Sequence, residues 1–191
     1  MHGAHCTWTV HPHLHAAHCT LNGNYNALML ALRYVHMLAL VAWLGGMAIL
    51  GALVAPTTFQ VLQAADPLSG RALGGEVFGA IIARFHYVAY AAGGLLLVTM
   101  AGMALLGPRP RAFAIRVGLI TAMLAVAVYS GVIVLGNIDQ VQLDAGGLVS
   151  RLAVDDERRI RFDALHRLST NLMLLNMAGA LVLLYWEARE P

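Results

Sequence analysis

The chain of 191 residues is 59% hydrophobic and has a mean hydropathy of +0.69, a composition that excludes an ordinary water-soluble domain. All 12 basic side chains are arginines, and the 10 acidic ones leave a net charge of +2, too small to favour a nucleic-acid partner. Four apolar stretches, at residues 28–54, 80–106, 112–135 and 166–186, each reach the roughly 20 residues that a helix needs to cross a bilayer. The sequence therefore predicts an all-α, integral membrane four-helix bundle surrounded by the lipid bilayer.

Residues 1–27 form a histidine- and cysteine-rich N-terminal tail ahead of the four-helix domain at residues 28–191. The tetrapeptide AHCT occurs twice in this tail. Two imidazoles and two thiols would make a tetrahedral donor set suited to zinc or copper, and further imidazoles lie between them. The candidate metal ligands are His5, Cys6, His11, His13, His15, His18 and Cys19. Because the AHCT spacing is not that of a standard zinc finger, a tail without a physiological metal is the alternative.

The first span, residues 28–54, follows Asn26, a good helix-capping residue, and is expected to stop at Pro56, which cannot continue a helix. One face of this helix carries a stripe at the spacing of successive turns, which should point into the bundle. The stripe consists of His36, Leu40, Trp43 and Met47.

Residues 57–79 mix apolar and polar side chains around Asp66-Pro67 and Gly74-Gly75. This pattern predicts an interfacial helix, a turn and a re-entry into the membrane. The second span then carries Ala89, Gly93 and Gly94, whose small side chains allow another helix to pack closely.

The connection GPRPR, residues 107–111, is predicted to be a tight turn, and with Arg116 it brings three arginines and no acid together. By the positive-inside rule this loop is cytoplasmic, and an even number of spans then places both termini on the cytoplasmic side. We expect an integral protein of a bacterial inner membrane. The opposite connection, residues 137–165, interleaves arginines with acids, and the fourth helix should begin near residue 155.

Three histidines lie in or beside the spans: His36, His86 and His166. Ionisable groups inside a bilayer are costly, so each is expected to face the bundle interior. A neutral imidazole in an apolar bundle is a common axial ligand of haem, and methionine is a common second ligand. We therefore expect a b-type haem held by His86 with His166, or by His36 with Met173 opposite. The alternative is that these histidines only form hydrogen bonds between helices.

The segment YVHMLALVAWLGGMAILGALVAPTTF resembles the first helix of several small four-helix membrane families, with a histidine seven residues before a tryptophan, then a glycine pair, a proline and a phenylalanine. Together with GEVFGAIIARF and RFDALHRLSTNLMLLN, it resembles the transmembrane protein 205-like domain family most closely. That resemblance implies a four-helix integral membrane protein without a settled activity. The first helix is also similar to those of the copper-resistance protein D family and of four-helix protoporphyrinogen oxidases, which implies haem binding at His36.

The spans hold no G-x-S-x-G, Walker or H-E-x-x-H motif, so no residues are found that would support hydrolysis or nucleotide binding. No catalytic residue is assigned. Soft methionine sulfurs in the spans suit copper as Cu(I). The leading hypothesis is a redox or metal-handling membrane component that binds haem or copper through its intramembrane histidines. The alternative is a non-catalytic accessory subunit that docks with other membrane subunits.

Overall fold

The structure, a computed structural model, describes residues 12–146 and 149–189, with side chains from Asn24 onward except that of Ser150. It is all-α, as predicted, and within these residues four helices are long and apolar enough to cross a membrane: Asn24–Ala65, Gly70–Leu106, Phe113–Asp144 and Glu157–Ala188. The elements are α1 (Pro12–Ile49), η1 (Leu50–Val54), α2 (Ala55–Ala65), α3 (Gly70–Leu106), α4 (Phe113–Val128), η2 (Tyr129–Val134), α5 (Leu135–Asp144), η3 (Val149–Arg151) and α6 (Glu157–Ala188).

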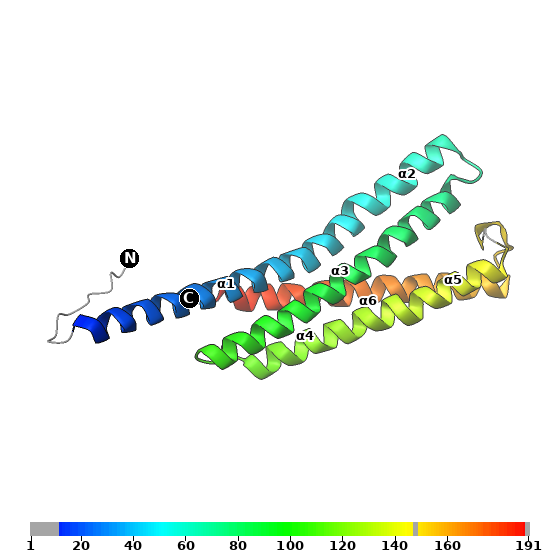
Figure 1. Cartoon of the computed structure of the whole chain (residues 1–191). Helices are drawn as coiled ribbons and strands as arrows, with labels where there is room; N and C mark the ends of the chain where they lie inside the picture. Colours follow the sequence, from blue (N-terminus) through cyan, green and yellow to red (C-terminus); the bar gives the residue numbers. More distant parts are fainter. Residues whose placement is uncertain (1–11, 147–148, 190–191) are drawn as a thin grey trace.

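The helices pack side by side along most of their length (Figure 1). α1, η1 and α2 form one continuous helix, which packs against α3, and α4, η2 and α5 form another. The N-terminal turns of α1 project beyond the bundle, at the end where the C-terminus and the short connection between α3 and α4 also lie (Figure 1). The N-terminal end of α1 and the C-terminal end of α6 therefore lie at one end of the bundle (Figure 1), although α1 begins at Pro12 rather than near residue 28.

Pro56 does not end the first helix, contrary to the prediction. η1 is a π-helical turn in which the Ala55 N–H bonds to the Leu50 carbonyl, and Pro56 lies in the first turn of α2. A proline normally leaves one helical hydrogen bond unmade and clashes with the carbonyl of the turn before it. The wider π turn relieves this clash. The helix therefore continues to Ala65.

The predicted interfacial helix is the direct continuation of the first span, since α2 extends the line of α1 (Figure 1). The predicted turn is present at residues 66–69, where the Asp66 carboxylate accepts hydrogen bonds from the backbone N–H groups of Leu68 and Ser69. α3 then begins at Gly70, ahead of the predicted start at residue 80. The third helix likewise runs to Asp144 instead of ending near residue 135.

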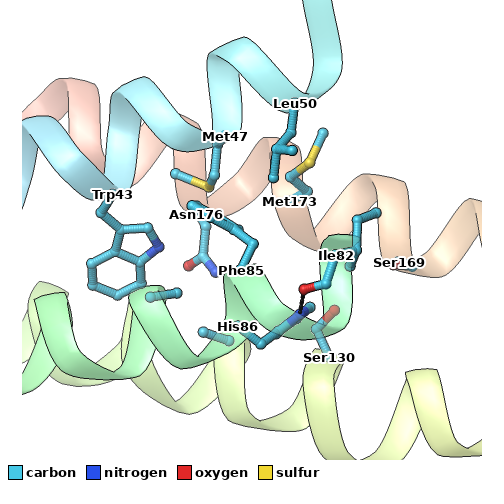
Figure 2. A pocket seen from close by; sticks show the side chains of 12 residues that line it. Trp43, Met47, Leu50, Ile82, Phe85, His86, Ser130, Ser169, Met173 and Asn176 are labelled. Carbon is cyan, nitrogen blue, oxygen red and sulfur yellow. Dashed lines mark hydrogen bonds between the residues drawn. The ribbon is translucent and has the colours of Figure 1, made fainter. Parts of the chain in front are cut away.

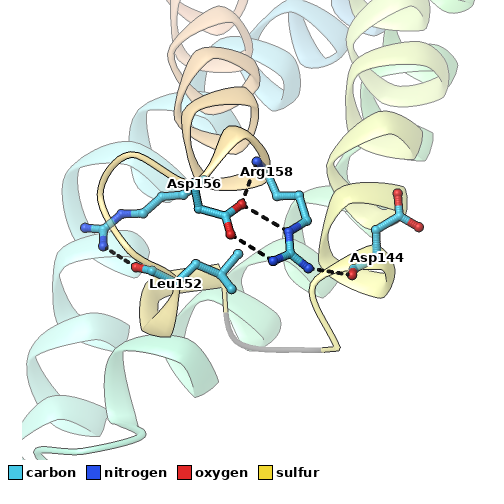
Figure 3. Close-up of polar contacts among 5 residues, drawn as sticks. Asp144, Leu152, Asp156 and Arg158 are labelled. Carbon is cyan, nitrogen blue, oxygen red and sulfur yellow. Dashed lines mark hydrogen bonds and ion pairs between the residues drawn. The ribbon is translucent and has the colours of Figure 1, made fainter.

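The fourth helix begins at Glu157, close to the predicted start, and Asp156 caps it (Figure 3). The Asp156 carboxylate accepts a hydrogen bond from the Arg158 backbone N–H at 2.9 Å and forms an ion pair with the Arg158 guanidinium at 2.8 Å. The side-chain hydrogen bond from Arg158 lowers the pKa of Asp156 to about 2. Because this value lies below the ordinary 3.8, the charged cap is present above about pH 4 and is lost as the pH falls toward 2. Arg158 also donates to the Asp144 carbonyl at 3.2 Å, which links α6 to α5.

Of the two adjacent glycines in the second span, Gly93 lies against neighbouring helices, whereas Gly94 does not. A Cβ at Gly93 would stand 2.8 Å from Cδ1 of Leu124 and 3.1 Å from Cζ3 of Trp43, whereas nothing lies within 4 Å of a Cβ at Gly94. Gly93 therefore allows side chains of α1 and α4 to approach the backbone of α3 closely.

Replacing Gly93 by leucine is expected to lower the free energy of unfolding by about 1–3 kcal/mol, because the added side chain overpacks this contact. The Gly94→Leu variant is the matched control and should equal or exceed the wild type in stability, since a glycine inside a helix costs about 0.5–1 kcal/mol relative to alanine. Thermal unfolding of the two variants in detergent distinguishes them, and equal losses would contradict the packing described.

Candidate functional site

Each long helix presents one stripe of side chains to the core. The predicted stripe on α1 is confirmed, since all four of its residues are buried. The buried stripe of α4 and η2 includes Arg116, Ile120, Met123, Ala127 and Ser130. That of α6 includes Asn176, Ala180 and Leu183. Polar side chains interrupt the apolar core at two levels, one around His86 and one around His36.

A cavity of about 50 Å³ lies in the core at the first of these levels (Figure 2). We call it the His86 pocket. Its lining includes Met47 from α1, His86 from α3, Ser130 from η2, and Ser169, Met173 and Asn176 from α6. A single water needs about 10–15 Å³ of such space, so the pocket has room for a few waters or one small ion.

Both π-helical turns take part in this pocket, because Leu50 of η1 and Ser130 of η2 line it. π turns within α-helices recur at functional sites. Gly131 of η2 leaves room for the His86 ring, because a Cβ at residue 131 would stand 2.4 Å from Cδ2 of His86. The irregular turns thus shape the cavity and hold the imidazole against one wall.

The imidazole of His86 presents an unprotonated nitrogen. Its Nδ1 lies 2.9 Å from the Ile82 carbonyl oxygen (Figure 2), and because a carbonyl can only accept, Nδ1 carries the proton. In the neutral ring the lone pair is then on Nε2. Histidines that bind metals commonly donate their other N–H in this way, to a carbonyl or a carboxylate.

Asn176 brings an unsatisfied acceptor to the pocket. The residue is 5% exposed, and its Oδ1 has no hydrogen-bond partner among the described residues. Buried polar atoms are nearly always paired, so an orphaned carbonyl oxygen beside a cavity indicates a polar occupant such as water or a cation.

The second polar level is a buried cluster that we call the Glu187 cluster: His36 from α1, Thr99 from α3, Arg116 from α4 and Glu187 from α6. His36 and Arg116 are each 1% exposed. The Glu187 carboxylate forms an ion pair with the Arg116 guanidinium, and its Oε1 lies 3.3 Å from Nε2 of His36. Nδ1 of His36 lies 2.8 Å from the Thr99 hydroxyl. One side chain from each of the four spans therefore meets here.

The structure separates the predicted ligands. His86 and Met173 line the same pocket, although the sequence assigns them to different ligand pairs. His36 belongs to the Glu187 cluster, which lies about 16 Å along α1 from Met47 at 1.5 Å per residue. His166 is exposed and stacks on Phe162 with 6.3 Å between the ring centroids. The expected pairing of His86 with His166 does not form.

The residues present do not fit a haem. Both ring nitrogens of His36 face protein partners, His166 lies outside the core, and the pocket of about 50 Å³ beside His86 is much smaller than a porphyrin. The space between His86 and Met173 is large enough only for a ligand far smaller than a porphyrin. We therefore assign no chemistry to a tetrapyrrole.

The tail lies largely beyond what the structure describes. His5, Cys6 and His11 fall outside the described residues, and His13, His15, His18 and Cys19 fall on α1 where only the backbone is described. Across the described part of the chain, no group of three or more histidine, cysteine, aspartate or glutamate side chains is gathered for a metal. A metal site within the described residues would therefore need donors of other kinds as well, such as thioethers.

Sequence reasoning missed Thr99, Arg116 and Glu187. The sequence groups Arg116 with the arginines of the turn, although it lies within α4, one turn before Ile120. Glu187 continues the stripe of Asn176, Ala180 and Leu183 at the same spacing, so that stripe could have identified it. Nothing in the sequence marks Thr99 as part of a site, because the hydroxyl of a threonine in a span usually forms a hydrogen bond with a backbone carbonyl of its own helix.

Four apolar helices of spanning length, whose buried polar groups gather at two levels inside the bundle, define a multi-pass integral membrane protein. Residues 38–146, more than half of the chain, match the family called domain of unknown function (DUF4149), and the chain belongs to this family. The match includes Met47, His86, Arg116 and Ser130, whereas α6 lies outside it. No curated protein and no solved structure matches the chain.

Proposed function

We propose that this membrane protein handles copper and that the His86 pocket binds Cu(I). The observation that carries the proposal is that the imidazole of His86 and the thioethers of Met47 and Met173, from three different helices, line one pocket (Figure 2). Thioether sulfur and imidazole nitrogen are ligands that Cu(I) accepts, whereas hard cations require oxygen. The carbonyl oxygen of Asn176 is a further neutral contact for a cation.

Charge supports Cu(I) over a divalent metal. The pocket is lined by neutral side chains only, with no carboxylate and no thiol. A divalent ion placed there would keep two uncompensated charges in a water-poor interior, where burying charge is expensive. A monovalent ion bound by neutral donors carries half of that charge.

The N-terminal tail fits the same role as a collector of copper or zinc. Its cysteines and histidines provide donors for both metals, and α1 connects it directly to Met47. We infer that the tail and both termini lie in the cytoplasm of a bacterium, as the arginine-rich turn between α3 and α4 indicates. The resemblance to the copper-resistance protein D family in the first helix is in keeping with this role.

The Met173→Leu variant is expected to lose one Cu(I) ion per chain, or to bind it at least about tenfold more weakly, because leucine keeps the volume of methionine but has no donor. The full-length protein in detergent is titrated with Cu(I) under reducing conditions in competition with a chromophoric chelator. Met177→Leu is the matched control, since this half-buried methionine packs against the same core without lining the pocket.

Equal Cu(I) binding by the wild type and the Met173→Leu and His86→Gln variants would refute the pocket as a metal site. It would confine any copper to the tail. A full-length protein that binds no Cu(I) would refute the copper role altogether and favour the accessory-subunit hypothesis.

A further inference from the structure

The Glu187 cluster differs from the His86 pocket in chemistry, because it is charged and contains no sulfur donor. Trp43 and Leu40 on α1 and Leu183 on α6 are fully buried between the two levels. Glu187 lies in the last turn of α6 and is 13% exposed, whereas His36 is 2% exposed at its side chain. The cluster is therefore separated from the pocket by apolar side chains and is most accessible at the end of the bundle where the termini lie.

We propose that the Glu187 cluster is a buried proton-binding site, with His36 as the group that takes up and releases the proton. The proposal rests on a count of the hydrogen atoms that these side chains can share. It does not depend on copper binding.

Thr99 has one hydroxyl hydrogen and three acceptors within reach. Its Oγ1 lies 2.8 Å from Nδ1 of His36, 2.7 Å from the Leu95 carbonyl and 3.1 Å from the Leu96 carbonyl. Carbonyl oxygens only accept hydrogen bonds, whereas an imidazole nitrogen accepts or donates according to its protonation. The hydroxyl can therefore donate either to His36 or to its own helix, and the protonation of His36 decides between the two.

In the neutral state, the Thr99 hydroxyl donates to Nδ1 of His36, and Nε2–H donates toward the Glu187 carboxylate. The charges of Arg116 and Glu187 then cancel. When a proton from the solvent binds to Nδ1, that nitrogen becomes the donor to Thr99 Oγ1, and the hydroxyl hydrogen turns to the Leu95 carbonyl. The cluster gains one positive charge, and the hydroxyl hydrogen of Thr99 and the ring hydrogens of His36 each have an acceptor in both states.

The charged neighbours of His36 oppose one another. From the described residues of the packed helices, Glu187 on α6 favours the imidazolium, while Arg116 on α4 and burial disfavour it; α3 contributes the neutral Thr99. Arg33, on α1 itself, is exposed. With these influences opposed, the charged neighbours of His36 favour neither protonation state outright, so the cluster accommodates both.

The test is a pH titration of the full-length protein in detergent, with ¹⁵N-labelled histidine observed by NMR and the His36 signals assigned by their loss in the His36→Gln variant. We expect Nε2 to be protonated throughout and Nδ1 to gain a proton between about pH 8 and pH 5. Glu187→Gln should weaken proton binding at His36 by about tenfold or more, since it removes the negative charge that lies against Nε2.

His166→Gln is the matched control, because this exposed histidine lies outside the cluster and its loss should leave the His36 titration unchanged. A wild-type His36 that keeps a single protonation state across this range would overturn the proposal, whether or not the variants fold. An unchanged His36 titration in a folded Glu187→Gln variant would also overturn it.

Discussion

Replacing Arg116 by methionine is expected to lower the free energy of unfolding by about 3–5 kcal/mol, because it leaves the Glu187 carboxylate buried without its cation. Arg116 is 1% exposed, and it joins α4 to α6 through this ion pair. Equilibrium unfolding in mixed micelles, followed by circular dichroism, measures the loss.

Two variants separate the loss of the charge pair from the loss of packing. The double variant Arg116→Met with Glu187→Met should recover much of the stability, since replacing both partners of a buried pair is far less costly than removing one. Arg84→Met is the control for losing an arginine, and because Arg84 is exposed its effect should stay within about 0.5 kcal/mol. A single Arg116→Met variant as stable as the wild type would mean that this pair does not hold α4 to α6.

Replacing Trp43 by alanine is expected to cost a similar amount, about 3–5 kcal/mol, through the large cavity that it leaves. Trp43 is 1% exposed, packs next to Gly93 of α3, and forms part of the wall of the His86 pocket. Removing the ring joins the new space to the existing cavity. The variant should therefore lose stability and also weaken Cu(I) binding, because the donors on α1 and α3 are no longer held apart at a fixed distance.

Tyr87→Ala is the matched aromatic control, since Tyr87 is 73% exposed on α3 and faces away from the core. Its effect on the free energy of unfolding in detergent should be small. If the tryptophan and tyrosine variants unfolded at the same temperature, the buried stripe of α1 would not be the centre of the core.

The four-helix membrane bundle could be predicted because span length and apolar composition are properties of each segment by itself. The inward stripe of α1 followed from spacing alone, and it correctly placed His36 and Trp43 in the core. The ends of the helices could not be predicted in the same way. Pro56 continues its helix only because a π turn precedes it, and no residue pattern announces that turn.

The candidate sites depend on which helix faces pack against one another. A single sequence does not contain that information. By helical spacing His166 and Asn176 share one face of α6, yet the first is exposed and the second is buried, since no residue of α6 before Asn176 is buried. His36 and His86 both face inward but at different depths, so they enter separate sites. The partner that defines the site of His36 is Glu187, near the other end of the chain.

X-ray absorption at the copper edge tests the copper site most directly. The full-length protein with Cys6→Ser and Cys19→Ser is loaded with one equivalent of Cu(I); since the chain has 2 cysteines, every sulfur that remains belongs to a methionine. A shell containing both imidazole nitrogen and sulfur, with less sulfur when Met173 is changed to leucine, is the predicted result. A shell of nitrogen alone, or one that the Met173→Leu change leaves as it was, would contradict a copper site between α1, α3 and α6.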